Sequence, residues 1–179
     1  MMVLGTLAIL PAAEQVLSGG RMAAAARDLA TTFHGLRWKS VARNRSHGLL
    51  FERDSRGWYW YEVEDGNGNG LRTAEVGSGT DPTLSGPHRM EERVHRVTPG
   101  FPSSGPFPRI SGSGAIGGLN DPIKFGPSNL ISFSPLGTSS SGTVYLTDGK
   151  RELFGVVLFG PTGRVRVWRF QSDRGRWRL

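Results

Sequence analysis

The apolar and polar positions of the chain change from a helical to an extended pattern along its length. Over residues 21–45, apolar side chains recur at intervals of three and four, which places them on one face of an α-helix. This stripe consists of Met22, Ala26, Leu29, Phe33, Leu36 and Ser40-Val41. Off the stripe lie Arg27, Arg37, Lys39 and Arg43. The pattern predicts an amphipathic helix with one face packed against the rest of the protein.

Residues 1–13 form a separate apolar segment, because Glu14 is the first charged side chain. The segment is shorter than the ~20 apolar residues that cross a bilayer, and no Lys or Arg precedes it, as one would in a secretory signal peptide. Two interpretations of the segment are left. Either it is a buried core helix, or the true start of the chain lies upstream and residues 1–13 are part of a longer apolar segment. We expect the latter, with residues 1–45 forming one rod that Pro11 kinks but does not end. The candidate membrane and assembly arm consists of Val3, Leu4, Ala8, Ile9, Leu10 and Pro11.

Beyond residue 46 the apolar period shortens to two, which is typical of β-strands. Leu49 and Phe51, a turn at residues 54–57, and the aromatic run WYWY at residues 58–61 predict a hairpin. Four further strand-like runs, expected to pair as an antiparallel sheet, cover residues 130–134, 143–147, 153–159 and 164–170.

Residues 77–128 are rich in Gly, Pro and Ser, which predicts a long, partly mobile insertion with one strand near residues 93–97. A helix followed by strands predicts an α+β fold in which the helix lies across the sheet. We therefore expect an N-terminal arm and helix over residues 1–45 and a β-rich head over residues 46–179.

Several classes of active site are excluded or disfavoured by residue content. The chain has no cysteine, which excludes disulfides, thiolate nucleophiles and cysteine zinc sites. Its histidines, His34, His47, His88 and His95, do not have zinc-ligand spacing. The serine run at residues 139–141 lacks the strand and helix that frame a nucleophile, and the carboxylates form no evident pair. We expect neither enzymatic activity nor a small-molecule substrate.

One segment resembles half of a calcium-binding loop. Asp65, Asn67 and Asn69 occupy ligand positions one, three and five, and Gly70 occupies position six. The glutamate expected at position twelve is replaced by Val76. Asn and Gly are also the residues that tight turns require. We interpret the segment as a structural turn, with calcium as the one possible cofactor.

The formal net charge is +7, and much of it lies at the C-terminal end, where residues 164–179 hold six arginines and one acid, Asp173. In a strand, Arg164 and Arg166 share a face with Trp168, while Val165 and Val167 lie on the other. Two guanidinium groups and an indole on one face can bind phosphates and stack on a base. The alternative is a solvated, arginine-rich edge strand. The candidate DNA-binding set is Arg164, Arg166, Trp168 and Arg169.

The order of these segments resembles that of GspH/FimT-type minor pseudopilins. The resemblance rests on a helix, an aromatic strand, an acidic-glycine turn and two C-terminal strands, with a looser stretch at residues 85–130. The matching segments are residues 22–30 (MAAAARDLA), 36–37, 41–45 (VARNR), 47–52 (HGLLFE), 57–61 (GWYWY), 65–73 (DGNGNGLRT), 141–149 (SGTVYLTDG) and 160–168 (GPTGRVRVW).

The resemblance implies a pilin-like fold, with a long helix on an antiparallel head, and a structural role in the filament of a type II secretion system. It implies other pseudopilins or pilins as partners, and a single-pass anchor in the bacterial inner membrane with the head outside the cytoplasm. Some pilus members of the family bind DNA through a Gly-Arg-x-Arg segment, a role that the resemblance carries to Arg164 and Arg166. The processing signal of the family, a glycine followed by Phe-Thr-Leu-Ile-Glu, is missing, and we expect a misassigned start of the chain.

Overall fold

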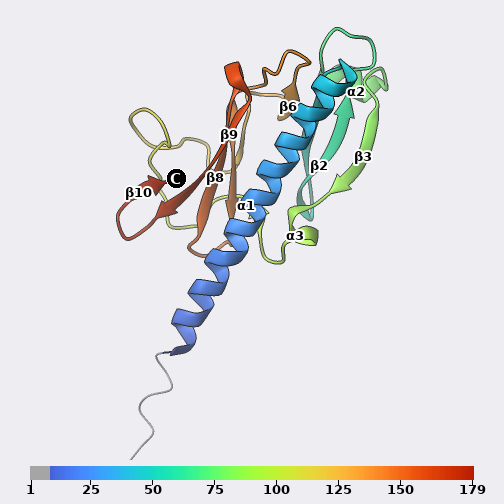
Figure 1. Ribbon diagram of the computed structural model, residues 1–179. Helices are drawn as coiled ribbons and strands as arrows, with labels where there is room; N and C mark the ends of the chain where they lie inside the picture. Colours follow the sequence, from blue (N-terminus) through green and yellow to red (C-terminus); the bar gives the residue numbers. More distant parts are fainter. Residues whose placement is uncertain (1–8) are drawn as a thin grey trace, which may run out of the picture.

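The computed structural model describes residues 9–179 of the chain and has an α+β layout. One N-terminal helix, α1 (Ile9–Arg43), precedes antiparallel sheets and crosses the head diagonally (Figure 1). Of the expected assembly arm, Ile9, Leu10 and Pro11 lie in the first turn of α1, and Val3, Leu4 and Ala8 lie outside the described residues.

Within the described residues, α1 runs without a break through Gly19 and Gly20, as expected for one rod that extends ahead of the apolar stripe. The stripe itself is confirmed: Met22, Ala26, Leu29, Phe33, Leu36 and Ser40 are all at most 2% exposed. Val41 is the exception, since it is 48% exposed and only Ser40 faces the core. A stripe of this width is enough to fix which side of the helix meets the sheets.

The end of α1 is set by a left-handed residue. Asn44 has φ 52°, and its N–H donates to the Val41 carbonyl at 3.4 Å, while the Arg45 N–H donates to the Ser40 carbonyl at 3.2 Å. This pair of bonds is a Schellman motif, which satisfies carbonyls that the last helical turn leaves without partners. The chain therefore turns sharply into the first strand.

The first sheet has the strand order β3-β2-β1-β6. It consists of β1 (His47–Asp54), β2 (Gly57–Glu64), β3 (Thr83–His88) and β6 (Leu130–Phe133). The predicted aromatic hairpin is confirmed, with Phe51 opposite Trp60 and their ring centroids 5.7 Å apart. Trp60 is 2% exposed and supplies the core, while Trp58, Tyr59 and Tyr61 of the same strand are half-buried.

The second sheet has the order β10-β9-β8-β7-β4, and β5 also pairs with β7. Its strands are β4 (Thr98–Pro99), β5 (Ile123–Lys124), β7 (Gly142–Thr147), β8 (Leu153–Phe159), β9 (Arg164–Gln171) and β10 (Arg176–Arg178). A short 3-10 helix, η1 (Gly160–Thr162), joins β8 to β9. The expectation of one sheet is thus corrected to two, and β10 was not predicted.

The main core lies between α1 and both sheets. Phe33 of the helix packs against Phe133 of the first sheet, with ring centroids 5.9 Å apart. Val144, Val156 and Leu158 of the second sheet belong to the same buried cluster. One helix stripe therefore joins the two sheets into a single head.

The Gly/Pro-rich segment at residues 77–128 is built into both sheets. After α2 (Thr73–Ser78) it contributes β3 to the first sheet, and β4 and β5 to the second. The strand expected near residues 93–97 does not form, because Arg93 ends α3 (Met90–Arg93) and Val97 is a buried residue before β4. Isolated apolar side chains anchor the segment, among them Met90, Phe107, Ile123 and Phe125.

Candidate functional site

The outer face of the second sheet carries the predicted arginines. Val165 and Val167 pack against the main core, so the alternation of β9 puts Arg164, Arg166 and Trp168 on the face away from α1. Arg164 and Arg166 are exposed, and neither forms a salt bridge with any described residue. Two solvated guanidinium groups beside a half-buried indole are the chemistry that the sequence predicted for this strand.

Arg169 does not belong to this set, because it lies on the opposite face of β9. Its guanidinium binds the Glu152 carboxylate through Nε at 3.1 Å and a second nitrogen at 3.0 Å. The same group lies 5.9 Å from the centroid of the Phe154 ring. A Cβ added at Gly19 of α1 would be 3.3 Å from the Arg169 guanidinium. Arg169 therefore contributes to the junction between α1 and the sheet rather than to a DNA-binding face.

Residues of four strands extend the outer face toward β5. Lys124 is opposite Thr143, Thr143 is opposite Val157, and Val157 is opposite Arg166. Directly opposed residues of an antiparallel pair project to the same side. This cross-strand row of Lys124, Thr143, Val157 and Arg166 therefore forms one continuous strip of surface.

A cavity of about 400 Å³ lies at the Lys124 end of this strip. It is lined by Arg109, Ile110, Ser111, Ile116, Gly117, Lys124, Thr143 and Tyr145. Sequence reasoning missed it, because it forms where the Gly/Pro-rich segment folds over β7.

The candidate calcium ligands organise a turn, which is the interpretation that we preferred from the sequence. The Asp65 carboxylate accepts the N–H groups of Gly68 at 2.7 Å and Gly70 at 2.8 Å. The side-chain amides of Asn67 and Asn69 both donate to Glu75, each at 3.0 Å. These bonds, the one from Asn69 most strongly, lower the pKa of Glu75 below its usual value. Among the described residues, no cluster of three or more His, Asp or Glu side chains is arranged to hold a metal.

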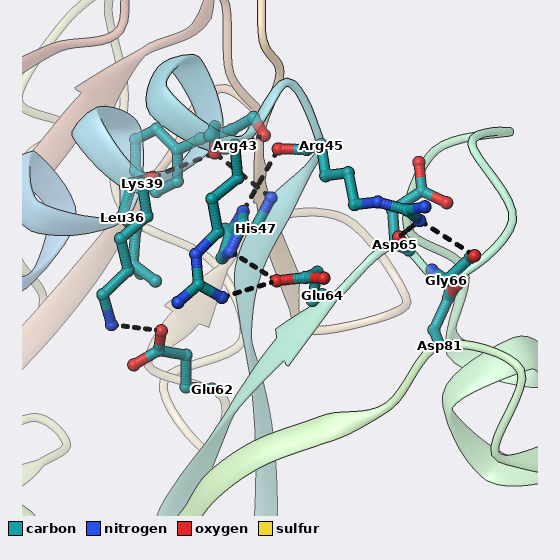
Figure 2. A network of polar contacts seen from close by, with 12 residues as sticks. Leu36, Lys39, Arg43, Arg45, His47, Glu62, Glu64, Asp65, Gly66 and Asp81 are labelled. Atoms are coloured by element: carbon teal, nitrogen blue, oxygen red, sulfur yellow. Dashed lines mark hydrogen bonds and ion pairs between the residues drawn. The ribbon is translucent and has the colours of Figure 1, made fainter.

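A polar network joins the C-terminal end of α1 to β1 and β2 (Figure 2). The buried Ser40 hydroxyl donates to the Leu36 carbonyl at 2.9 Å or the Phe133 carbonyl at 3.0 Å, and it accepts the His47 N–H. Arg43 and His47 converge on the Glu64 carboxylate, at 3.0 and 2.9 Å. Lys39 pairs with Glu62, which precedes Glu64 on the same strand. The helix end is therefore fixed by both charge and hydrogen bonds.

A second contact fixes the helix where it leaves the head. The Ser18 hydroxyl donates to the Asp148 carboxylate at 2.7 Å, in the turn between β7 and β8. Burial tends to raise the pKa of Asp148, but the hydrogen bonds from Ser18 and from the backbone N–H groups of residues 150–152 outweigh it, and the pKa is lowered. Together with Gly19 against Arg169, this contact marks the edge of the head.

Comparisons of the chain with protein-family models, with curated proteins and with solved structures found no match. Within residues 9–179, no helix combines the length and apolar character needed to cross a membrane.

Proposed function

We propose that this protein is a filament subunit of the minor pseudopilin type, with a pilin-like fold, anchored in the inner membrane of a type II secretion system. The proposal depends on the division of α1 into a part that the head covers and a part that it does not. Its stripe over residues 22–40 is buried against both sheets, whereas its first turns extend beyond the head (Figure 1). Leu17, next to the edge of the head, is 62% exposed.

Assembly would use the part of the helix that the head does not cover. Residues 1–13 carry no charge, and taking one Leu-sized side chain out of water contributes about 1.5–3 kcal/mol. Packing several such side chains among the helices of neighbouring subunits, or in lipid, would therefore drive association. The contacts of Ser18 and Gly19 with the second sheet would hold the head at a fixed place on this rod.

Site-specific crosslinking tests the proposal, because the chain has no cysteine and one introduced thiol gives a clean signal. A photocrosslinker attached to Leu17→Cys in the full chain, expressed in its own cells, should capture other helical filament subunits. Ser55→Cys, in the exposed turn between β1 and β2, is the matched control and should capture far fewer. Equal capture at both positions, or none at Leu17→Cys, would count against a filament subunit.

A second candidate function is nucleic-acid binding by a type IV minor pilin. The observation that favours it is the exposure of Arg164 and Arg166 on one face with Trp168, with no acidic partner among the described residues. Cations placed this way release counterions from a phosphate backbone, which makes binding strongly dependent on salt.

The double variant Arg164→Ala with Arg166→Ala tests this second function. It should abolish binding at moderate salt, or lower the dependence of log affinity on log salt by about 1.8 for duplex DNA, since each contact contributes about 0.9. Lys150→Ala with Arg151→Ala removes the same charge from an exposed turn elsewhere and is the control. If both double variants bind alike, the face on β9 is not the binding surface.

A further inference from the structure

We propose that the cavity beside Arg109 and Lys124 is a second subsite of the outer face, which takes one unpaired nucleotide of a single-stranded nucleic acid. The inference rests on the second candidate function and names its substrate class. It is carried by three observations: packed side chains fix the wall of the cavity, two cations line it beside apolar side chains, and its Lys124 end belongs to the same cross-strand row as Arg166.

The wall of the cavity is fixed by buried side chains. Phe107 and Ile116 of the overlying loop pack with Tyr145 and Leu153 of the sheet. The Trp177 indole N–H donates to the Pro108 carbonyl at 2.7 Å, which ties the loop to β10. A loop packed this way gives a preformed cavity, and preformed sites lose less entropy when a ligand binds.

A glycine lets this wall approach the sheet. A Cβ added at Gly155 of β8 would be 2.5 Å from Ile110 Cδ1, so a larger residue would displace the Ile110 side chain from its place over the sheet. Gly155 is directly opposite Trp168 on one side and Tyr145 on the other. The cavity and the indole of β9 are therefore separated only by the width of one strand.

The charges within the cavity favour an anion. The Arg109 Nε donates to the Ala115 carbonyl at 3.3 Å, and no salt bridge to a described acid engages this guanidinium. The Lys124 ammonium donates to the Gly118 carbonyl at 2.9 Å and lies 3.6 Å from the Asp121 carboxylate. Two cations against one acid leave a net positive site, which Thr143 also lines.

The cavity lies on the same outer face as the arginines of β9. Lys124 and Arg166 stand at the two ends of the cross-strand row, three strand spacings apart, which is about 14 Å at about 4.8 Å per spacing. The two residues between them are a hydroxyl side chain, Thr143, and an apolar one, Val157. A strand whose phosphates contact Arg164 and Arg166 can therefore continue across β8 and reach Lys124.

The shape of the cavity favours an unpaired nucleotide over a duplex. Its volume lies in the range of about 300–1,000 Å³ typical of small-ligand sites. The half-buried Ile110 offers apolar surface for a base, while Arg109 and Lys124 offer charge for its phosphate. Bases in a duplex are stacked and paired, so a duplex could bring only backbone to the rim.

Binding by the full chain to two probes tests the inference. The probes are a labelled oligothymidylate of about 10 nucleotides, within the site sizes known for single-strand binders, and a blunt duplex of the same length. We expect tighter binding of the single strand. Arg109→Gln with Lys124→Gln should weaken single-strand binding about 10-fold and lower its salt dependence by about 1.4, from about 0.7 per phosphate contact.

The possible results distinguish failure of the subsite from failure of the second candidate function. The control Lys150→Gln with Arg151→Gln removes equal charge, and far-ultraviolet circular dichroism shows that each variant is folded. If the two double variants bind the single strand alike, or if the wild type binds duplex as tightly as single strand, the subsite is wrong and the β9 site stands. If the wild type binds neither probe at low salt, both the subsite and the second candidate function are wrong.

Discussion

The imidazole of His47 lies with Nε2 2.9 Å from the Glu64 carboxylate, and its side chain is completely buried. Its other ring nitrogen, Nδ1, is 3.1 Å from the Arg45 carbonyl, and its backbone N–H donates to the Ser40 hydroxyl at 3.2 Å (Figure 2). One residue thus touches the end of α1, the connection to β1 and the end of β2. This contact fixes the angle at which the chain passes from helix to sheet.

Replacing His47 should therefore destabilise the whole head. His47→Ala removes a buried ring and leaves Glu64 and the Arg45 carbonyl without this partner, for a loss of about 2–4 kcal/mol in the free energy of unfolding. His34→Ala is the matched control, because His34 is exposed on α1, and it should change stability by no more than about 0.5 kcal/mol. Urea unfolding of both variants measures the difference, and similar midpoints would show that the network contributes little.

Substitutions on the buried and the exposed face of α1 should also differ sharply in their effect on the free energy of unfolding. Phe33 is fully buried and Trp38 is 74% exposed, although both are large aromatic residues on the same helix. Phe33→Ala should cost about 3–5 kcal/mol because it opens a cavity in the core, whereas Trp38→Ala should stay within about 0.5 kcal/mol. Thermal or urea unfolding tests this order. A Trp38→Ala variant as unstable as Phe33→Ala would mean that the helix packs through a different face.

The parts of the fold that follow a local period could be predicted from the sequence. The stripe from Met22 to Ser40 and the aromatic strand around Trp60 each repeat at the period of their own element, and both lie where that period puts them. The division into two sheets could not be predicted. It depends on β1 pairing with β6 rather than β7, and local sequence does not encode a pairing between strands so far apart in the chain.

The strands of the Gly/Pro-rich segment, residues 77–128, could not be predicted for a related reason. Its buried residues, such as Met90, Phe107 and Ile116, are single apolar positions that produce no period, yet each fills a gap in the core. The candidate site was predicted where alternation decides the face, at Arg164 and Arg166. Arg169 lies on the other face, because its odd position along β9 puts it with Val165 and Val167. The partner Glu152 depends on strand register, which local sequence does not encode.

Acid should weaken the turn between β1 and β2. The Arg89 guanidinium bound to Asp54 lowers the pKa of that carboxyl below its usual value of 3.8. A lowered folded-state pKa means that the pair stabilises the fold above pH 3.8, and that this contribution is lost as the pH falls through the lower value. Asp54→Asn should therefore be less stable than the wild type near neutral pH, with the gap closing below pH 3.8.

Urea midpoints measured from neutral to acid pH test this expectation. Arg89→Gln removes the partner instead of the carboxyl, and it should abolish the same acid-dependent part of the stability. A gap between wild type and Asp54→Asn that stays constant with pH would show that the loss has another cause, such as packing of the turn.

Gly163, which precedes Arg164 in the Gly-Arg-x-Arg segment, serves the architecture of the turn. It has φ 60°, and an added Cβ would be 2.8 Å from the Gly137 carbonyl oxygen and 3.0 Å from Arg37 Nε. Gly175 has nearly the same backbone, φ 57°, but nothing lies within 4 Å of its added Cβ. The two glycines therefore separate backbone strain from crowding within one protein.

Gly175→Ala should cost about 1–2 kcal/mol, which is the strain of an L-residue in the left-handed region. Gly163→Ala carries the same strain and must also displace a backbone carbonyl and the Arg37 side chain, so its loss in the free energy of unfolding should be clearly larger. Urea unfolding of the two variants measures both. Equal losses would show that the turn between β6 and β7 yields easily to a methyl group. Gly163 would then be required only for its backbone conformation, and Arg37 would not be held against the start of β9.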